Sequence, residues 1–187
     1  MSKKSRGVNG KQKGASFERK VCKDLSFWLS GGEHPDLLWR SAMSGGRSRV
    51  LAKQGVTASN QLGDLSSINR LGEPLTNNFI VECKFYKDLD LHKIITGGKS
   101  KLTEFWKQLW FDCKENEKFP MLIAKQNFMP VIVCLDDYGK NILFNVTTNR
   151  TNKQKLKTTV YVPRCPEMNI YHYDDLLKCN PKALPHV

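Results

Sequence analysis

The chain has 187 residues, of which 40% are hydrophobic, so it is long enough for one folded domain and too apolar to be intrinsically disordered. Its 30 Lys and Arg outnumber 18 Asp and Glu, and the formal net charge of +12 favours a polyanionic partner, nucleic acid above all. No apolar run approaches the roughly 20 residues of a membrane helix, and residues 1–14 do not contain the apolar segment of a signal peptide. We therefore expect a cytoplasmic protein with no membrane partner.

The chain begins with a segment that predicts a flexible basic arm. Residues 1–14 carry Lys and Arg, among them Lys11 and Lys13, without an acidic residue. They are either a solvated tail or an arm that contacts DNA. A helix is expected over residues 15–30, because apolar residues recur at helical spacing from Phe17 to Trp28 and two glycines follow.

A second basic segment, residues 44–62, is rich in Gly, Ser and Gln and predicts a mobile loop after a short strand at residues 37–43. It contains the cations Arg47, Arg49 and Lys53. Loops carried on a rigid sheet are where substrate contacts usually lie, so we expect these cations to contact phosphates. The alternative is a solvated loop whose charges only aid solubility.

The remaining elements alternate between strands and helices. Strands are expected at residues 64–71, 78–86, 120–125, 131–135, 141–146 and 158–162, and helices at residues 100–114 and 174–178. Residues 127–130 predict the turn of a hairpin, and the Gly72–Pro74 and Asn77–Asn78 stretches predict another turn. The aromatic stripe of the second helix is expected to be core and not a base-stacking surface. The order of elements predicts an α/β protein.

The strand at residues 78–86 carries charge among apolar residues. Side chains alternate along a strand, so Glu82 and Lys84 project to one face. A carboxylate beside Val81 and Cys83 is costly unless it is paired, hydrogen-bonded or metal-bound. The plainer interpretation is a Glu–Lys pair on a solvated sheet face.

Two further carboxylates, Asp64 and Glu18, are candidates for a metal site together with Glu82. Asp64 follows Gly63 at the start of the preceding strand, and a hairpin would bring it near Glu82. Repulsion between two adjacent carboxylates is relieved by a hard cation such as Mg²⁺. Glu18 is the only charged member of a line of residues down the first helix, and its alternative role is an interaction with the helix dipole.

The other residue patterns do not indicate a CxxC pair, a zinc site or a nucleotide-binding site. The six cysteines form no CxxC pair and are expected to be small buried hydrophobes. Cys165, His172, Cys179 and His186 are evenly spaced, but structural zinc sites favour close paired ligands, so no zinc is expected. There is no GxxxxGK[ST] motif, so no nucleotide cofactor is expected.

Several segments together resemble the PD-(D/E)xK nuclease superfamily, and within it the archaeal Holliday-junction resolvases and related phage endonucleases. The matching stretches lie between residue 13 and about residue 135 and are Lys13–Arg19, Trp39–Ala42, Gly63–Leu65, Ile80–Lys84 and Phe119–Lys125. The resemblance implies a restriction-endonuclease-like α-β-β-β-α-β core with a mixed central sheet. The chain is therefore expected to consist of the arm 1–14, a nuclease core 15–135 and a β-rich C-terminal extension 136–187 packed on that core, and the resemblance leaves this extension unassigned.

The resemblance also implies roles for the site residues. Asp64, Glu82 and the Cys83 backbone carbonyl would bind Mg²⁺, with Mn²⁺ able to substitute, and Lys84 would be the catalytic lysine. Glu18 would complete the acidic cluster, directly or through water. Lys11, Lys13, Arg40, Ser41, Arg47, Arg49 and Lys53 would contact DNA. A homodimer in a bacterial, archaeal or phage-infected cell would fit such an enzyme.

The sequence departs from the family pattern at one informative place. Gly63 stands where the family has Pro before the first Asp, and the literal Pro35-Asp36 pair precedes the first strand and is taken as a decoy. The resulting hypothesis is a Mg²⁺-dependent DNA endonuclease, with branched or Holliday-junction DNA as one substrate. A restriction- or repair-type duplex nuclease and a non-cleaving DNA-binding or assembly protein are the alternatives.

Overall fold

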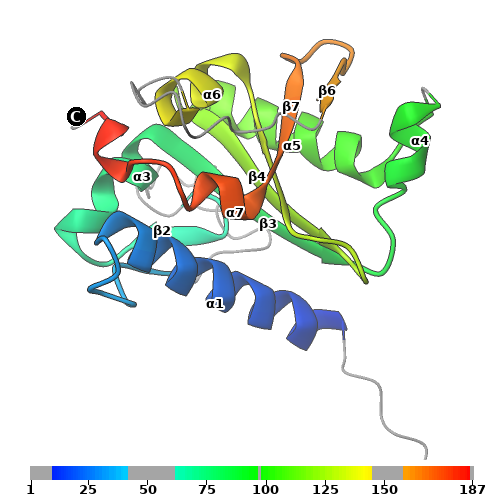
Figure 1. Cartoon of the computed structure of the whole chain (residues 1–187). Coiled ribbons are helices and arrows are strands. Elements are labelled where there is room, and N and C mark those ends of the chain that lie inside the picture. The colour runs from blue at the N-terminus through cyan, green and yellow to red at the C-terminus, as the bar shows by residue number, and fades with distance from the viewer. Residues whose placement is uncertain (1–9, 42–61, 97, 145–157, 186–187) are drawn as a thin grey trace, which may run out of the picture.

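The computed structural model describes residues 10–41, 62–96, 98–144 and 158–185 (Figure 1). The helices are α1 (Gly10–Leu29), α3 (Glu73–Asn78), α4 (Leu91–Ile95), α5 (Lys101–Glu115), α6 (Asp137–Phe144) and α7 (Tyr173–Leu176), with 3-10 turns η1 (Arg70–Gly72) and η2 (Pro181–Ala183). The strands are β1 (Leu38–Arg40), β2 (Leu65–Ser67), β3 (Phe79–Tyr86), β4 (Phe119–Gln126), β5 (Ile132–Leu135), β6 (Thr158–Val160) and β7 (Met168–His172). Within those ranges, no helix combines the length and hydropathy required to span a bilayer.

A five-stranded mixed sheet in the order β3-β4-β5-β7-β6 forms the centre of the molecule. β3 and β4 are parallel, and the chain joins them through α4 and α5. The β4–β5, β5–β7 and β7–β6 pairs are antiparallel. The expected strands at residues 78–86, 120–125 and 131–135 are confirmed, as is the hairpin between the last two.

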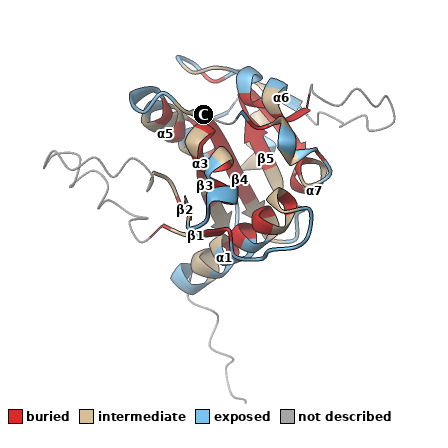
Figure 2. Cartoon of the chain, turned by 90° about the vertical axis from the view of Figure 1, so that its left-hand side faces the viewer, coloured by how far each residue is buried: buried red, intermediate tan, exposed pale blue. Residues whose placement is uncertain are grey.

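Helices cover both faces of this sheet and bury its apolar side chains (Figures 1 and 2). On one face α1 packs with α6, α7 and η2 around residues such as Leu25, Val81 and Tyr173. On the other face α5 contributes Leu102, Trp106, Leu109 and Cys113 to a second core. The stripe of α5 is therefore core, as expected, with Phe105 and Trp110 half-buried.

A short antiparallel ribbon of β1 and β2 lies beside α1 and carries the chain toward β3. The buried Ser26 hydroxyl on α1 accepts the N–H groups of Leu37 and Leu38 at 3.1 and 3.0 Å. This pair of hydrogen bonds fixes the start of β1 against the helix, and β1 in turn sets the position of β2.

Several expectations from the sequence need correction. α1 begins at Gly10 and not near residue 15, so Lys11 and Lys13 lie on a helix. The strand expected at residues 64–71 ends at Ser67, and η1 and α3 replace the turn expected near Pro74. α3 starts there because Pro is suited to the first turn of a helix, where its missing N–H has no partner to lose.

The expected strand at residues 141–146 is instead the end of α6. A short apolar run such as Ile142–Phe144 fits a strand or a helix equally well. The structure favours a helix because the Asp136 carboxylate accepts the Gly139 N–H at 2.7 Å before the run begins.

The C-terminal segment is not the β-rich addition that was expected. It contains α6, α7 and η2, and β7 lies inside the central sheet between β5 and β6. Trp28 on α1 donates its indole N–H to the Cys179 carbonyl at 2.8 Å. β7 was missed because residues 163–187 hold Pro and polar residues on either side of one short apolar stretch.

Candidate active site

Asp64 is held against β3 by its backbone and by its side chain. Its N–H donates to the Val81 carbonyl at 2.9 Å. Its Oδ2 accepts the Cys83 N–H at 2.8 Å. The hairpin expected to join the two strands is absent, since η1 and α3 lie between β2 and β3. The expected approach of Asp64 to the Glu82 strand nevertheless occurs.

Gly63 explains why this chain does not have Pro before the aspartate. Gly63 has φ +78°, whereas the proline ring fixes φ near −65°. A Cβ atom at this position would lie 2.6 Å from the Val81 carbonyl oxygen, well inside van der Waals contact. Only glycine therefore allows the backbone to approach β3 closely enough for Asp64 to bond Val81 and Cys83. The sequence signal was the glycine itself, which was noted only as a departure from the pattern.

The Asp64 carboxyl lies in an environment that opposes its ionisation. It is 6% exposed. Burial, followed by repulsion from Glu82, raises its pKa to about 7, and Glu18 adds to that repulsion. Lys84 and the Cys83 N–H act in the opposite direction but do not compensate. The site therefore has an excess of buried negative charge.

Glu82 and Lys84 share one face of β3, as the alternation of the strand predicted. Their side chains form an ion pair, and each is about a fifth exposed. Burial alone would lower the pKa of Lys84, but the attraction and hydrogen bond of Glu82, with a contribution from Asp64, raise it above its ordinary value. Lys84 is thus a cation at neutral pH and suits charge stabilisation better than proton abstraction.

Glu18 lies on α1 and is paired with Arg40 of β1, with 2.5 Å between Glu18 Oε2 and Arg40 Nε. Its carboxylate is close enough to Asp64 to raise the pKa of the latter. The structure thus brings Glu18, Asp64, Glu82 and Lys84 into one electrostatic cluster. Arg40, expected to contact DNA, is engaged with Glu18.

Ser41 is poorly placed for the DNA contact expected of it. It is 3% exposed, and its N–H donates to the Asp64 carbonyl at 2.8 Å. This hydrogen bond suits a residue that positions Asp64. Of the other expected DNA contacts, Lys11 is exposed on α1 and Lys13 is half-buried there, while Arg47, Arg49 and Lys53 lie outside the described residues.

The donor set fits a hard divalent cation. In the described ranges, no three His, Cys, Asp or Glu side chains are grouped as metal ligands. Mg²⁺ needs fewer, because it is usually bound through one or two carboxylates and retains several waters. Asp64 and Glu82 are two such carboxylates. Burial and then repulsion from Glu82 raise the pKa of Asp64, and a bound cation would relieve that repulsion.

Where the structure describes the C-terminal half, its cysteines and histidines form no group of three potential metal ligands. Cys179 is buried and donates its S–H to the Asp175 carbonyl at 3.3 Å, and Cys165 is half-buried. His186 lies outside the described residues. Cys22, Cys83, Cys113 and Cys134 are buried free thiols, as expected of small hydrophobes.

Comparison with known families identifies the chain. Residues 9–183 match the family described as phage putative PDDEXK endonuclease. The chain belongs to that family. The family is one of nucleases, so this membership supports the PD-(D/E)xK superfamily assignment, and the mixed sheet is compatible with a restriction-endonuclease-like fold. No curated protein and no solved structure matches the chain.

The extent of the family match changes the interpretation of the C-terminal segment. The resemblance seen in the sequence ended near residue 135, whereas the family match continues to residue 183. The family match therefore includes the segment that follows β5, and β7 of that segment lies within the central sheet.

Proposed function

We propose that this protein is a divalent-metal-dependent DNA endonuclease whose site comprises Asp64, Glu82 and Lys84, with Glu18 beside them. The observation that carries the proposal is the buried Asp64 carboxyl, fixed by the Cys83 N–H and repelled by Glu82. Folding places negative charge there at a cost in free energy. Because such groups cluster at functional sites and the chain belongs to an endonuclease family, we assign this carboxyl to the active site.

Asp64, Glu82 and the Cys83 carbonyl are the groups that would hold Mg²⁺ or Mn²⁺. A bound divalent ion supplies Lewis acidity and lowers the pKa of water. In the net reaction a water adds to phosphorus while one P–O ester bond breaks, leaving a phosphate monoester and a hydroxyl group.

The role that we assign to Lys84 is to stabilise the negative charge that develops on the phosphate. Its paired state with Glu82 and its raised pKa keep the ammonium protonated for that task. Glu18 and Arg40, as an ion pair beside Asp64, would set the local charge balance.

Finer features of the hypothesis are proposed on the resemblance alone. They are the restriction-endonuclease-like strand order, the division into an arm, a core and an extension, a homodimer that cuts both strands, and a preference for branched or Holliday-junction DNA. The cations Lys11, Arg47, Arg49 and Lys53 would bind phosphates in such complexes.

The test is cleavage of linear, nicked, branched and single-stranded DNA with Mg²⁺, with Mn²⁺ and with EDTA. The parent should cut with either metal and not in EDTA, and Asp64→Asn should not cut. Asp175→Asn is the matched control, because the Asp175 carboxylate pairs with Lys178 and is not part of the cluster around Asp64. Equal cleavage by the parent and Asp64→Asn would refute the assignment.

A non-cleaving DNA-binding protein is the second candidate. It is favoured by two ion pairs within the protein, Glu82 with Lys84 and Glu18 with Arg40. Of the carboxylates Glu18, Asp64 and Glu82, these pairs leave only Asp64 outside an ion pair within the part of the chain that the structure describes. DNA binding without cleavage in any metal would select this alternative.

A further inference from the structure

The tip of the β4–β5 hairpin carries an aromatic side chain in an unfavourable place. Phe128 is fully exposed, at 103% of its reference area. Its φ is +62°, a left-handed conformation that favours Gly or Asn and is an outlier for a bulky residue. Its neighbour Met129 is also exposed, at 46%. Both the backbone and the solvation of Phe128 thus cost free energy, and outliers of this kind cluster at binding sites.

The turn that presents Phe128 is fixed from several sides. Met129 N–H donates to the Gln126 carbonyl at 3.2 Å and closes the turn. Asn127 N–H donates to the Tyr86 carbonyl of β3 at 3.2 Å, and the Asn127 side chain accepts from the Lys13 ammonium on α1. Figure 1 shows this tip at the same end of the molecule as the start of α1.

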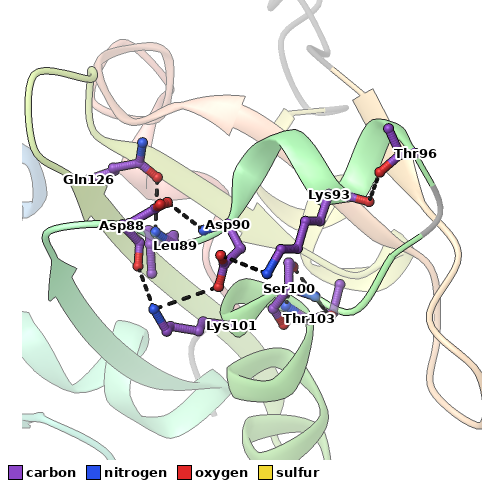
Figure 3. A network of polar contacts seen from close by, with 9 residues as sticks. All are labelled: Asp88, Leu89, Asp90, Lys93, Thr96, Ser100, Lys101, Thr103 and Gln126. Carbon is purple, nitrogen blue, oxygen red and sulfur yellow. Dashed lines mark hydrogen bonds and ion pairs between the residues drawn. The ribbon is translucent and has the colours of Figure 1, made fainter.

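A polar network supports the base of the same turn (Figure 3). The Gln126 Oε1 atom accepts the Leu89 N–H at 2.9 Å. Asp90 is paired with Lys93 and Lys101, so its charge is balanced within the network. A turn that hydrogen bonds already hold in one conformation loses little conformational entropy when a ligand binds to it, and this favours binding at Phe128.

Cations lie directly behind the tip. The ammonium groups of Lys13 and Lys125 lie 3.9 and 5.2 Å from the centre of the Phe85 ring. Phe85 also packs on Phe17 of α1, with 5.5 Å between ring centres. Lys13 bonds the side chain of Asn127, the residue before Phe128, and Lys125 lies three residues before Phe128. Proteins bind unpaired nucleic acid through exposed aromatic rings that stack on bases and cations that contact the backbone.

We infer that Phe128 is a stacking contact for a nucleobase that is free of a stacking neighbour, as at a gap, an end or a branch, with Lys13 and Lys125 binding the adjoining phosphates. This inference rests on the proposed function and deepens it by naming a class of substrate. Tyr86, whose carbonyl bonds the tip, is four residues after Glu82 on β3. At about 3.3 Å per residue, the bond that holds the tip lies about 13 Å from Glu82 along the strand.

The experiment measures binding of full-length protein in EDTA, so that cleavage does not intervene, to intact duplex and to the same duplex with a short gap containing 2-aminopurine. The parent should prefer the gapped DNA and quench its fluorescence. Phe128→Ala should lose about 5- to 100-fold in affinity for the gapped DNA, little for intact duplex, and the quenching. The salt dependence should be unchanged, whereas Lys13→Ala and Lys125→Ala should flatten it.

Two matched variants separate stacking from folding. Phe128→Asn removes the ring but suits the left-handed backbone, so it should be at least as stable as the parent and bind gapped DNA as poorly as Phe128→Ala. Phe111→Ala removes another exposed phenylalanine, on α5, and should bind like the parent.

Each contrary result has a distinct meaning. Undiminished binding and quenching by Phe128→Ala would overturn the inference and leave the proposed function intact. A change of oligomeric state in Phe128→Ala, with DNA affinity unchanged, would also overturn it and make the tip a contact with a second copy. No preference of the parent for gapped DNA would overturn the inference, whereas the proposed function is decided separately by cleavage with Mg²⁺ or Mn²⁺.

Discussion

Asp64 and Asp136 are both buried aspartates, with 6% and 3% of their surface exposed, but the charged groups around them differ. Each accepts one backbone N–H, from Cys83 at 2.8 Å and from Gly139 at 2.7 Å. Burial raises the pKa of both carboxyls. A hydrogen-bonded buried aspartate is therefore not by itself a functional signal in this protein.

The neighbours of the two residues make the difference. Asp136 lies at the start of α6, where the free N–H groups of the helix stabilise a carboxylate. Asp64 faces Glu82, Lys84 and Glu18, and among the described elements no helix begins at Asp64 to account for its position. Asp136 is repelled only by its neighbour Asp137, which pairs with Lys140, among the causes of its raised pKa. The comparison indicates that the cluster of Glu82, Lys84 and Glu18, and not burial, marks the site.

The largest predicted difference comes from replacing each of the two aspartates, Asp64 and Asp136, by asparagine. Asp64→Asn keeps an acceptor for the Cys83 N–H but removes a charge that a metal needs, so cleavage should fall by at least ~10³-fold. Asp136→Asn should fold and cut like the parent, since Asn also caps helices well. Rates of DNA cleavage in saturating Mg²⁺ measure both, and a similar loss in the two variants would show that Asp64 is only structural.

Lys84 gives the next largest effect. Lys84→Ala should cut at least ~10²-fold more slowly, the scale of losing one electrostatic donor in a transition state, while DNA affinity changes little. Lys140→Ala is the control near Asp136, because Lys140 pairs with Asp137 on α6. If binding and cleavage fell together, Lys84 would be an affinity contact instead.

Stability should also distinguish the two aspartates. The folded pKa of Asp64, about 7, exceeds its ordinary value of 3.8, so its contribution to stability is most favourable below about pH 4 and is lost as the pH rises to about 7. In EDTA above about pH 7, Asp64→Asn should therefore be more stable than the parent, by no more than about 4 kcal/mol at about 1.4 kcal/mol per pKa unit.

Thermal unfolding with added Mg²⁺ provides the control for this stability difference. Mg²⁺ should raise the Tm of the parent and of Asp136→Asn but not that of Asp64→Asn, because a ligand stabilises only the fold that binds it. Thermal unfolding across this pH range, with and without Mg²⁺, measures both effects. A rise of equal size in all three proteins would exclude Asp64 from the metal site.

Local patterns predicted much of the architecture. The helical spacing from Phe17 to Trp28, the stripe of α5 and the apolar run of β3 each specified an element and its buried face. The alternation of Glu82 and Lys84 placed both on one face because the period of a strand is fixed.

What escaped prediction depends on contacts between distant segments. The role of Gly63 follows from the Val81 carbonyl behind it, and the pairing of Arg40 follows from Glu18 on α1. β7 is a strand because β5 and β6 flank it, and nothing in its short sequence records that. Phe128 looked like an ordinary turn residue, since its exposure and φ have no sequence signal.

The smallest predicted effect concerns Glu18, which connects the buried site to α1. Glu18→Gln removes one negative charge near Asp64 and leaves Arg40 without its ion-pair partner. If Glu18 serves the metal through water, the variant should stay folded and require several-fold more Mg²⁺ for the same rate, because an ion loses attraction with each charge removed. The measurement is the rate of cleavage as a function of Mg²⁺ concentration.

Arg40→Gln provides the matched control for Glu18, since it breaks the same ion pair and leaves the negative charge in place. It should require no more Mg²⁺ than the parent, because the carboxylate of Glu18 is then freed from its cation. If both variants shifted the Mg²⁺ requirement upward by the same factor, the ion pair itself would be the working unit, holding β1 and Ser41 in position behind Asp64. If neither variant shifted it, Glu18 would be left with a structural role alone, and the site would reduce to the three residues that β3 and Gly63 bring together.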